Sequence, residues 1–397
     1  MAYRCIDKER KIYLKKDSAR ALSDITRIVF DFDGVLVQTS QSYHQTIRKV
    51  VDHYFLEILD LEGEEGKLVT LGDIQEFKDT GLFNNDWNLS ESVIIHYLSI
   101  VLRRLKQKHV LKNFTKRFSN IQFSELRSFL QILGEVGDFL RHHGINATDL
   151  VNTKNDNAVG LKSFLAEIKQ NPLSDTLENV FPRVGSEKLT FIRKLAPYDL
   201  EKPDLLKRLF EESYLGAEIF NKFYGVPSIF KFNESFLEKE TFIATKKTLE
   251  SLSSRFGKLA IYSEKPRAQG MYILEKNDSR EYFDEERSIF NEDLIKSEVD
   301  NETVTLGKPN PALFIELIEK FVRNGGAAYV GDGIADVLLV ENARLDGLSN
   351  VSFLGVLCSS QHPYKLFSRY MEHEAEAIMR DVNDIPRIIA SLGGKIR

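Results

Sequence analysis

The sequence predicts an α/β protein in which a mainly parallel sheet is covered by helices and a large, mostly helical segment is inserted after the first strand. Two observations lead to this fold class. Short β-branched or aliphatic runs, typical of buried strands, alternate with helical patterns in the second half of the chain. More than 200 residues of helical character separate the first such run from the second. We therefore expect residues 1–40 and 241–397 to form a sheet domain and residues 41–240 a helical one.

The expected strands begin with Ile25–Phe30, which ends at a cluster of Asp and Gly residues. The later runs are 259–262, 327–330, 351–357 and, more weakly, 377–382. Helical patterns separate them, such as 311–322, where the apolar side chains recur on one face. Strands that alternate with helices in this way are typical of a Rossmann-like parallel sheet with helices on both sides.

The inserted segment shows apolar residues at helical spacing over 93–105, 123–140 and 205–215. We expect the first of these helices to begin near Ser90, with Ser90 as its N-cap. The stretch 146–179 is rich in Asn, Ser, Asp and Lys, so it is predicted to be irregular. We expect the region from about 100 to 200 to form a further insertion within the helical domain.

Composition excludes several classes of protein. The chain is 42% hydrophobic and 28% charged with a net charge of −5, and its basic residues alternate with acidic ones, so no nucleic-acid partner is expected. The two cysteines, Cys5 and Cys358, predict neither a disulfide framework nor a zinc site. The first residues are charged, and no apolar run approaches the roughly 20 residues that span a bilayer. A cytoplasmic protein without a membrane partner is expected.

Two carboxylates follow the first predicted strand. Asp31 and Asp33 are at positions i and i+2, which lie on the same face of an extended chain, and Gly34 permits a sharp turn after them. The carboxyl ends of parallel strands line the crevice where open α/β sheets bind ligands. The pattern therefore predicts that both carboxylates reach one ligand.

Other strand ends carry polar residues as well. Ser263 follows the run 259–262, and Asp332 and Asp336 follow the run 327–330. Lys308 lies in Gly-Lys-Pro-Asn-Pro, where two prolines restrain the backbone. Four carboxylates that converge without a cation would repel one another, and oxygen ligands alone favour Mg²⁺ over zinc. We therefore predict a magnesium site.

In order and spacing these segments resemble the four motifs of the haloacid dehalogenase-like (HAD) superfamily. The corresponding residues are Asp31-Phe32-Asp33-Gly34, Ser263, Lys308 and Gly331-Asp332-x-x-x-Asp336. The segment 81–87, Gly-Leu-Phe-Asn-Asn-Asp-Trp, is similar to the GxFNNDW cap signature of a subfamily IA branch that is linked by context to histidine biosynthesis, and 212–218 resembles the same branch. That branch usually has Thr-Gly-Arg-Pro where this chain has Ser263-Glu264-Lys265-Pro266, so Arg267 is expected to replace the lost arginine.

The resemblance implies a phosphatase that uses Mg²⁺ and acts on a small phosphorylated metabolite. Asp31 would attack phosphorus to form an aspartyl-phosphate, and Asp33 would protonate the leaving alcohol and then accept a proton from water. The metal would be held by Asp31, the Asp33 backbone carbonyl and Asp332, with Asp336 in its outer shell or orienting Lys308. Ser263 and Lys308 would hold the remaining phosphate oxygens. Histidinol phosphate is a candidate substrate only through its association with the branch.

The cap residues Asn84, Asn85 and Asp86, together with Arg267, would bind the leaving group, although the first three are also ordinary turn formers. A phosphomutase and a 2-haloacid dehalogenase are alternatives on the same fold, and Asp33 and the intact Gly-Asp-x-x-x-Asp argue against the dehalogenase. A non-catalytic binding protein is the alternative of another class. Such proteins typically lose the nucleophile or a metal ligand, and this chain keeps both.

Overall fold

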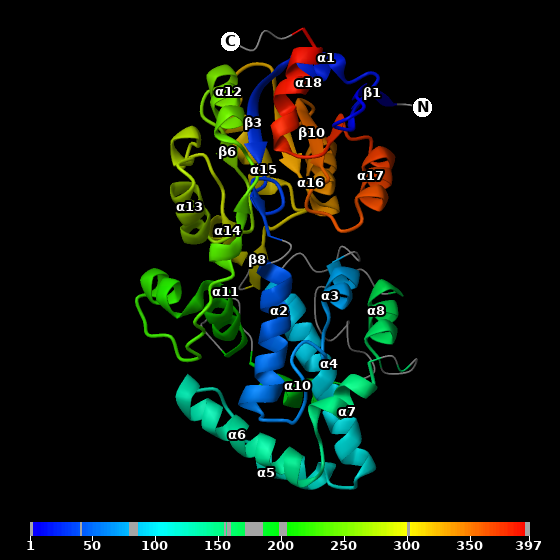
Figure 1. The fold of residues 1–397 in the computed structure, drawn as a ribbon, viewed down its shortest axis with the longest axis vertical. Coiled ribbons are helices and arrows are strands. Elements are labelled where there is room, and N and C mark those ends of the chain that lie inside the picture. The colour runs from blue at the N-terminus through cyan, green and yellow to red at the C-terminus, as the bar shows by residue number, and fades with distance from the viewer. Residues whose placement is uncertain are drawn as a thin grey trace. The chain divides into compact units, whose positions relative to one another are not determined.

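The computed structural model describes residues 3–39, 42–78, 86–154, 156, 160–170, 186–197, 205–299 and 302–393. The chain divides into two compact units (Figure 1). The sheet unit comprises Met1–Ser40 and Glu240–Arg397, and the helical unit comprises Gln41–Lys239.

The sheet unit is built on seven strands in the order β1-β2-β11-β10-β9-β3-β6. Their bounds are β1 Tyr3–Asp7, β2 Ile12–Lys15, β3 Ile25–Phe30, β6 Ala260–Ile261, β9 Gly326–Gly331, β10 Val351–Val356 and β11 Ala377–Met379. Strands β6, β3, β9, β10 and β11 run parallel to their neighbours among these five, and β9 and β10 are buried over their whole length. The predicted α/β class is confirmed, and each of the five predicted strands is present.

The chain begins with a hairpin that the sequence analysis did not predict. Strands β1 and β2 are antiparallel, and β2 joins the sheet antiparallel to β11. The strand Ile25–Phe30 is therefore the first of the parallel strands but the third in the chain. The hairpin escaped prediction because its strands are short, and β1 mixes charged with apolar residues and has no buried residue.

Helices cover the sheet, as expected for parallel strands. On one face, α15 (Ala312–Phe321) and α16 (Ile334–Leu345) place Phe314 and Val340 against Val29, Tyr329 and Phe353 of the strands. The alternate strand residues are buried too, so the opposite face is also covered. The chain winds from β3 to β6 in one direction and from β9 through β10 to β11 in the other. The switch between β3 and β9 marks the place where such sheets bind ligands.

The sheet unit contains further helices and a second hairpin. They are α1 Ala19–Ser23, α12 Lys246–Phe256, α13 Arg267–Lys276, η3 Arg280–Tyr282, α14 Asn291–Leu294, the hairpin β7 Ile295–Val299 with β8 Glu302–Thr305, α17 Pro363–Glu372, η4 Val382–Asp384 and α18 Ile385–Ser391. Strands β4 (Val37–Gln38) and β5 (Thr241–Phe242) pair antiparallel, so the segment that leaves the sheet unit lies beside the segment that returns to it.

The described part of the helical unit contains helices and no paired strand. The helices are α2 Ser42–Asp52, η1 His53–Ile58, α3 Leu71–Lys78, α4 Asp86–Gln107, α5 Leu111–Phe118, α6 Leu126–His142, α7 Ala147–Asn152, α8 Leu161–Gln170, α10 Ser186–Leu195, α11 Leu205–Tyr224 and η2 Leu237–Lys239. None of the described helices is long and apolar enough to cross a membrane.

Two expectations for this unit were wrong. Helix α4 begins at Asp86, so Ser90 is not its N-cap but an interior residue whose hydroxyl donates to the Asp86 carbonyl at 2.9 Å. The stretch predicted to be irregular contains α7 and α8. Helix α7 forms because the Asn146 side chain caps it by accepting from the Asp149 N–H at 2.7 Å. A residue that indicates a loop by composition here begins a helix.

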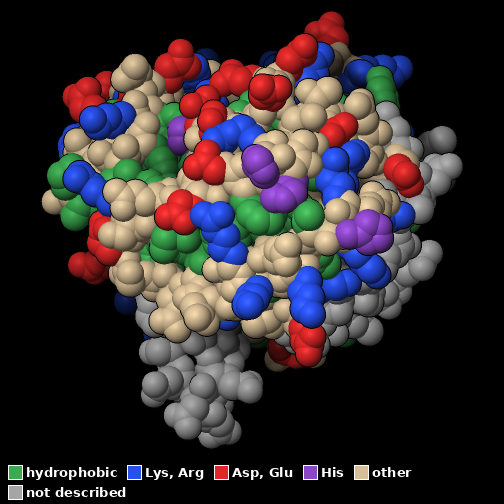
Figure 2. All heavy atoms as spheres, turned by 90° about the horizontal axis from the view of Figure 1, so that it is seen from below, with side chains coloured by type: hydrophobic (Ala, Val, Ile, Leu, Met, Phe, Trp, Pro, Cys, Tyr) green, Lys and Arg blue, Asp and Glu red, His purple; other side chains and the backbone are tan. Residues whose placement is uncertain are grey.

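The helical unit also carries a local basic surplus that the sequence analysis missed. Residues 92–124 contain seven Lys or Arg and no Asp or Glu. Figure 2, which views the end that carries α5 and α6, shows Lys, Arg and His side chains there together with Asp and Glu side chains. Basic residues occupy the last turns of α4, α5 and α6, where the helix dipole favours cations. This accounts for much of the surplus without a partner.

A buried histidine in α4 makes the stability of the helical unit depend on pH. His96 is 5% exposed, stacks on Phe164 at 4.9 Å, and its Nε2 makes no hydrogen bond within the described chain. Burial lowers the pKa of His96 to about 3. Its folded-state pKa lies below the unfolded value, so stability is lost as pH falls below about 6.5, by about 2 kcal/mol at pH 5.

Replacing this histidine by Phe should remove that loss. We expect His96→Phe to stabilise the protein at pH 7 by about 1 kcal/mol, because an unpaired buried nitrogen is removed, and by more at pH 5. Urea unfolding at both pH values measures the difference. The same change at exposed His142 is the control and should leave the pH dependence as it is. An equal effect of His96→Phe at both pH values would contradict the assignment of a neutral buried imidazole.

Candidate active site

Asp31 lies at the switch point, directly after β3. Its N–H donates to the Val330 carbonyl of β9 at 2.9 Å, so the sheet ladder fixes its backbone. The side chain is nearly buried, and Oδ1 accepts from the Phe32 N–H at 2.7 Å. Burial raises the pKa of Asp31 to about 7 despite the opposing effect of the Lys308 ammonium. Ionising a carboxyl group that is buried in this way costs free energy, and a bound cation would reduce that cost.

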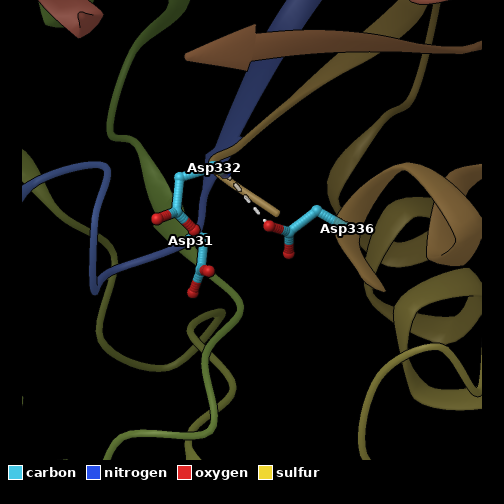
Figure 3. A group of neighbouring side chains, drawn as sticks. All are labelled: Asp31, Asp332 and Asp336. Carbon is cyan, nitrogen blue, oxygen red and sulfur yellow. Dashed lines mark hydrogen bonds between the residues drawn. The ribbon is translucent and has the colours of Figure 1, made fainter. Parts of the chain in front are cut away.

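Asp332 and Asp336 complete a carboxylate group with Asp31. Asp332 follows β9 and Asp336 lies in the first turn of α16 (Figure 3). One oxygen from each of the three carboxylates lies within 4.8 Å of the others. Burial, reinforced by the charges of Asp336 and Asp31, raises the pKa of Asp332 well above its usual range. The site therefore concentrates negative charge in a place poorly reached by water.

The Asp336 carboxylate is occupied by hydrogen bonds from the protein. Its Oδ2 accepts from the N–H groups of Asp332 at 3.0 Å and Gly333 at 2.9 Å. Its Oδ1 accepts from the Tyr329 hydroxyl at 3.0 Å and lies 2.8 Å from Lys308 Nζ. Asp336 thus holds the Asp332 backbone and the Lys308 ammonium in place. Of the two roles expected for Asp336, these contacts favour the orientation of Lys308.

Lys308 bridges the carboxylate group. Its Nζ lies 2.8 Å from Asp31 Oδ2 as well as 2.8 Å from Asp336 Oδ1, and the side chain is 6% exposed. Its backbone N–H donates to Glu264 Oε1 at 2.8 Å. Burial opposes the charged form, but the Asp31 and Asp336 carboxylates outweigh it and raise the pKa of Lys308. The ammonium therefore stays charged and balances one of the three carboxylates.

Gly34 shows why this position of the motif excludes a side chain. Its φ is +77°, in the left-handed region that glycine adopts without strain. A Cβ built at Gly34 would also overlap the carboxylate of Asp332. Its carbonyl accepts from the Ser359 hydroxyl at 2.6 Å. The turn after Asp33 thus packs closely against Asp332 at the end of β9.

Ser263 and the two residues after it join this region from β6. Ser263 is 1% exposed, and its Oγ accepts from the Lys265 N–H at 3.2 Å. The Lys265 ammonium lies 2.9 Å from Asp33 Oδ1 and 3.5 Å from Glu240 Oε2. Asp33 is not one of the three carboxylates whose oxygens lie within 4.8 Å of one another, and Lys265 is one of its partners.

The donor set suits a hard cation. Three carboxylates lie together near one ammonium, that of Lys308, and burial, together with the charges of the neighbouring carboxylates, raises the pKa values of Asp31 and Asp332. Carboxylate oxygens in such a group are ligands that Mg²⁺ prefers, and a divalent cation would offset the remaining charge. Each oxygen of Asp336 contacts two protein donors, whereas each oxygen of Asp31 contacts one, so Asp31 and Asp332 are the two carboxylates better placed to bind the metal directly.

The structure describes two of the four predicted substrate-binding residues, Asp86 and Arg267. Asn84 and Asn85 lie outside the described residues. Asp86 belongs to the helical unit, where its carboxylate lies 2.5 Å from Lys78 Nζ and links the start of α4 to the end of α3. The Arg267 guanidinium bonds to the carbonyls of Glu285 and Ser288 and to the carboxylate of Asp293, none of which is a predicted site residue.

Sequence reasoning missed three residues that touch the site. Lys265 and Glu264 lie in the segment where the sequence departs from the expected motif, and they contact Asp33 and the Lys308 backbone. Glu240, at the return to the sheet unit, contacts Lys265. The available signal was the position of Lys265, two residues after Ser263, because alternate residues in an extended segment lie on the same side.

Comparison with known proteins shows the family. The sequence model of the haloacid dehalogenase-like hydrolases matches residues 25–344. The chain belongs to this family of hydrolases. No curated protein matches the sequence.

One solved structure shares the fold, and others are similar to parts of it at lower scores. An X-ray structure from the Northeast Structural Genomics Consortium is 16% identical with a TM-score of 0.61, and the match covers 93% of this chain and 99% of that one. A HAD-superfamily hydrolase of subfamily IA, variant 1, from Geobacter sulfurreducens is 12% identical with a TM-score of 0.34, covering 92% and 97%. A predicted phosphoglycolate phosphatase from Haemophilus somnus is 13% identical with a TM-score of 0.38, covering 92% and 98%.

Proposed function

We propose that the protein is a Mg²⁺-dependent phosphomonoester hydrolase that works through an aspartyl-phosphate on Asp31. The observation that carries this proposal is the environment of Asp31: its carboxylate lies 2.8 Å from the Lys308 ammonium and within 4.8 Å of Asp332 and Asp336. A nucleophilic carboxylate beside positive charge suits the attack on an anionic phosphate, because charge stabilisation is the main contribution a protein makes to phosphoryl transfer.

In the first step, an Asp31 oxygen forms a bond to phosphorus while the bond from phosphorus to the alcohol oxygen breaks. Asp33 gives its proton to the departing alkoxide. In the second step, Asp33 takes a proton from water, whose oxygen bonds to phosphorus as the bond to Asp31 breaks. Lys308 and Ser263 hold the other phosphate oxygens in both steps.

Magnesium fits the same arrangement. Held by Asp31 and Asp332, and by the Asp33 carbonyl as the motif implies, Mg²⁺ would supply positive charge that reduces the repulsion between the carboxylate and the phosphate. Asp336 contributes indirectly, because it holds Lys308 and the Asp332 backbone.

We further propose that the helical unit, about residues 41–240, serves as the cap that selects the leaving group of a small phosphorylated metabolite. Histidinol phosphate is one candidate, by association with the branch that carries the GxFNNDW signature, whose residues 81–85 lie outside the described chain. The expected cytoplasmic location and the absence of nucleic-acid and membrane partners stay predictions.

A phosphate-release assay on a panel of phosphorylated metabolites, with and without Mg²⁺, tests the function. We expect release only with Mg²⁺. Halide release from a 2-haloacid without metal would indicate the dehalogenase alternative, and isomerisation without net phosphate release would indicate the phosphomutase. No turnover of any kind, with retained ligand binding, would favour a non-catalytic binding protein.

Asp86 tests whether the start of α4 recognises substrate. Its ion pair with Lys78 supports a structural role, and loss of that pair in Asp86→Ala should cost about 1 kcal/mol of stability. If Asp86 also contacts the leaving group, turnover of the best metabolite should fall at least tenfold while p-nitrophenyl phosphate is hydrolysed normally. Lys78→Ala is the matched control, since it breaks the same pair and keeps the carboxylate. If turnover of the best metabolite is the same in Asp86→Ala and Lys78→Ala, Asp86 has only a structural role.

A further inference from the structure

Lys265, two residues after Ser263, is buried next to Phe32 and Asp33. The Lys265 side chain is fully buried, with its Nζ 2.9 Å from Asp33 Oδ1 and 5.7 Å from the centre of the Phe32 ring. On another side lies Glu240 Oε2, at 3.5 Å, on a side chain that is 1% exposed. Asp33, by contrast, keeps 26% of its side chain exposed.

A buried ammonium requires charged partners in fixed positions. An unpaired charge would be expensive at this depth, so the two carboxylates and Lys265 stabilise one another only in a well-defined geometry. Burial by itself would lower the pKa of Lys265, but Asp33 and Glu240 more than offset it and the pKa is raised. The lysine therefore stays charged and restrains the Asp33 carboxylate.

The same short segment supports two motifs at once. Glu264 accepts from the backbone N–H of Lys308, and Lys265 holds the side chain of Asp33. The positions at which this chain departs from Thr-Gly-Arg-Pro are thus connected to the acid/base residue and to the phosphate-binding lysine. In the proposed mechanism Asp33 must reach both the leaving group and water, so a contact that fixes its carboxylate bears on both steps.

We propose that Lys265 is the positioning residue of Asp33: its ammonium, itself held by Glu240, orients the Asp33 carboxylate for proton transfer. The inference rests on the proposed phosphatase function. Lys265 does not touch the reacting atoms and acts through Asp33 in both steps. Without it, Asp33 loses this ion pair, and the protonation of the alcohol and the deprotonation of water both become slower.

A double-mutant cycle tests this directly. Lys265→Met removes the charge with little change in shape, and we expect kcat for an alkyl phosphate to fall about a hundredfold or more, with KM nearly unchanged. Lys265→Arg, which keeps the charge, should recover most of the loss. If Lys265 acts through Asp33, the double variant Asp33→Asn/Lys265→Met should be no slower than Asp33→Asn alone. Additive losses would overturn the proposal.

A burst experiment adds a readout that general damage to the fold would not produce. The p-nitrophenolate group leaves without a proton, so Lys265→Met should form the aspartyl-phosphate from p-nitrophenyl phosphate within about tenfold of the wild-type rate. Hydrolysis of the intermediate still needs Asp33, and a burst of p-nitrophenol followed by slow turnover is expected. Equal slowing of both steps would contradict a role through Asp33.

Controls separate the possible failures. Lys258→Met, on the surface just before β6, makes the same chemical change and should behave as the wild type. If Lys265→Met does not fold, the variant Lys265→Met/Glu240→Gln removes the buried partner charge and takes its place in the cycle and the burst. A wild-type enzyme that releases no phosphate would refute the proposed function, whereas an active enzyme indifferent to Lys265→Met would refute only this inference.

Discussion

Replacing Asp31 by Asn is expected to lower phosphate release by several orders of magnitude. The substitution keeps the size of the side chain but removes the attacking oxygen's charge and a ligand of the metal. It also removes one of the two carboxylates that hold Lys308, whose ammonium retains Asp336 at 2.8 Å. Steady-state kinetics on the best substrate measures the loss. Residual turnover above about one per cent of the wild type would contradict Asp31 as the nucleophile.

The same substitution should leave the fold intact and, without metal, stabilise it at high pH. Because the folded-state pKa of Asp31 is raised to about 7, ionisation of this carboxyl costs stability as pH rises from about 4 to 7. Above pH 7 the wild type carries the whole cost and Asp31→Asn carries none, while near pH 4 the two should converge. Asp346→Asn, on the surface at the end of α16, is the control and should show no such trend.

Metal removal is expected to have a comparable effect on activity. In excess EDTA phosphate release should cease, because without the metal the carboxylates of Asp31 and Asp332 repel the anionic substrate. Added Mg²⁺ should restore it. Ca²⁺ should bind but not support turnover, since it takes more ligands and a looser geometry. Full activity in EDTA would contradict the phosphatase assignment and favour the dehalogenase alternative.

Metal binding should also be visible without any substrate. Mg²⁺ at one hundred times its Kd should stabilise the folded protein by about 2.7 kcal/mol, measured as a rise in Tm. Because the metal-free pKa values of Asp31 and Asp332 are raised, metal must displace protons at low pH, and the rise in Tm should be larger at pH 8 than at pH 6. Asp332→Asn should abolish the rise, and an unchanged response would exclude Asp332 as a ligand.

The parallel sheet was predictable because its strands are buried on both faces. Strand β9 reads Gly-Ala-Ala-Tyr-Val-Gly and is buried throughout, so its apolar character is visible in the sequence itself. The opening hairpin was not predictable, because β1 mixes charged with apolar residues and pairs at the edge of the sheet. Helix α7 was missed for a related reason: Asn146 indicates a turn by composition, and only its hydrogen bond to the Asp149 N–H shows that it caps a helix.

Part of the candidate site was also predictable from the sequence, and part was not. Asp31, Asp332, Asp336 and Lys308 meet as their places at strand ends and in the Pro-restrained segment predicted, since topology alone brings such residues to one edge. The spacing of Lys265, two residues after Ser263, indicated only which side of the segment it occupies, because its pairing with Asp33 and Glu240 depends on side chains from three distant segments. Arg267, expected to replace a lost arginine, instead bonds to Asp293. Both Lys265 and Arg267 are cationic and follow Ser263, so charge alone could not show which of them contacts Asp33.

Trapping the intermediate tests the central claim most directly. Enzyme mixed with substrate and Mg²⁺ is quenched in acid, reduced with borohydride and digested, so that an aspartyl-phosphate becomes homoserine, and the peptides are analysed by mass spectrometry. We predict homoserine at position 31, none in Asp31→Asn, and oxygen from labelled water in the released phosphate rather than in the Asp31 carboxylate. Homoserine at another residue, or labelled oxygen in Asp31 itself, as water attack on the carbonyl of an ester intermediate would give, would contradict the account.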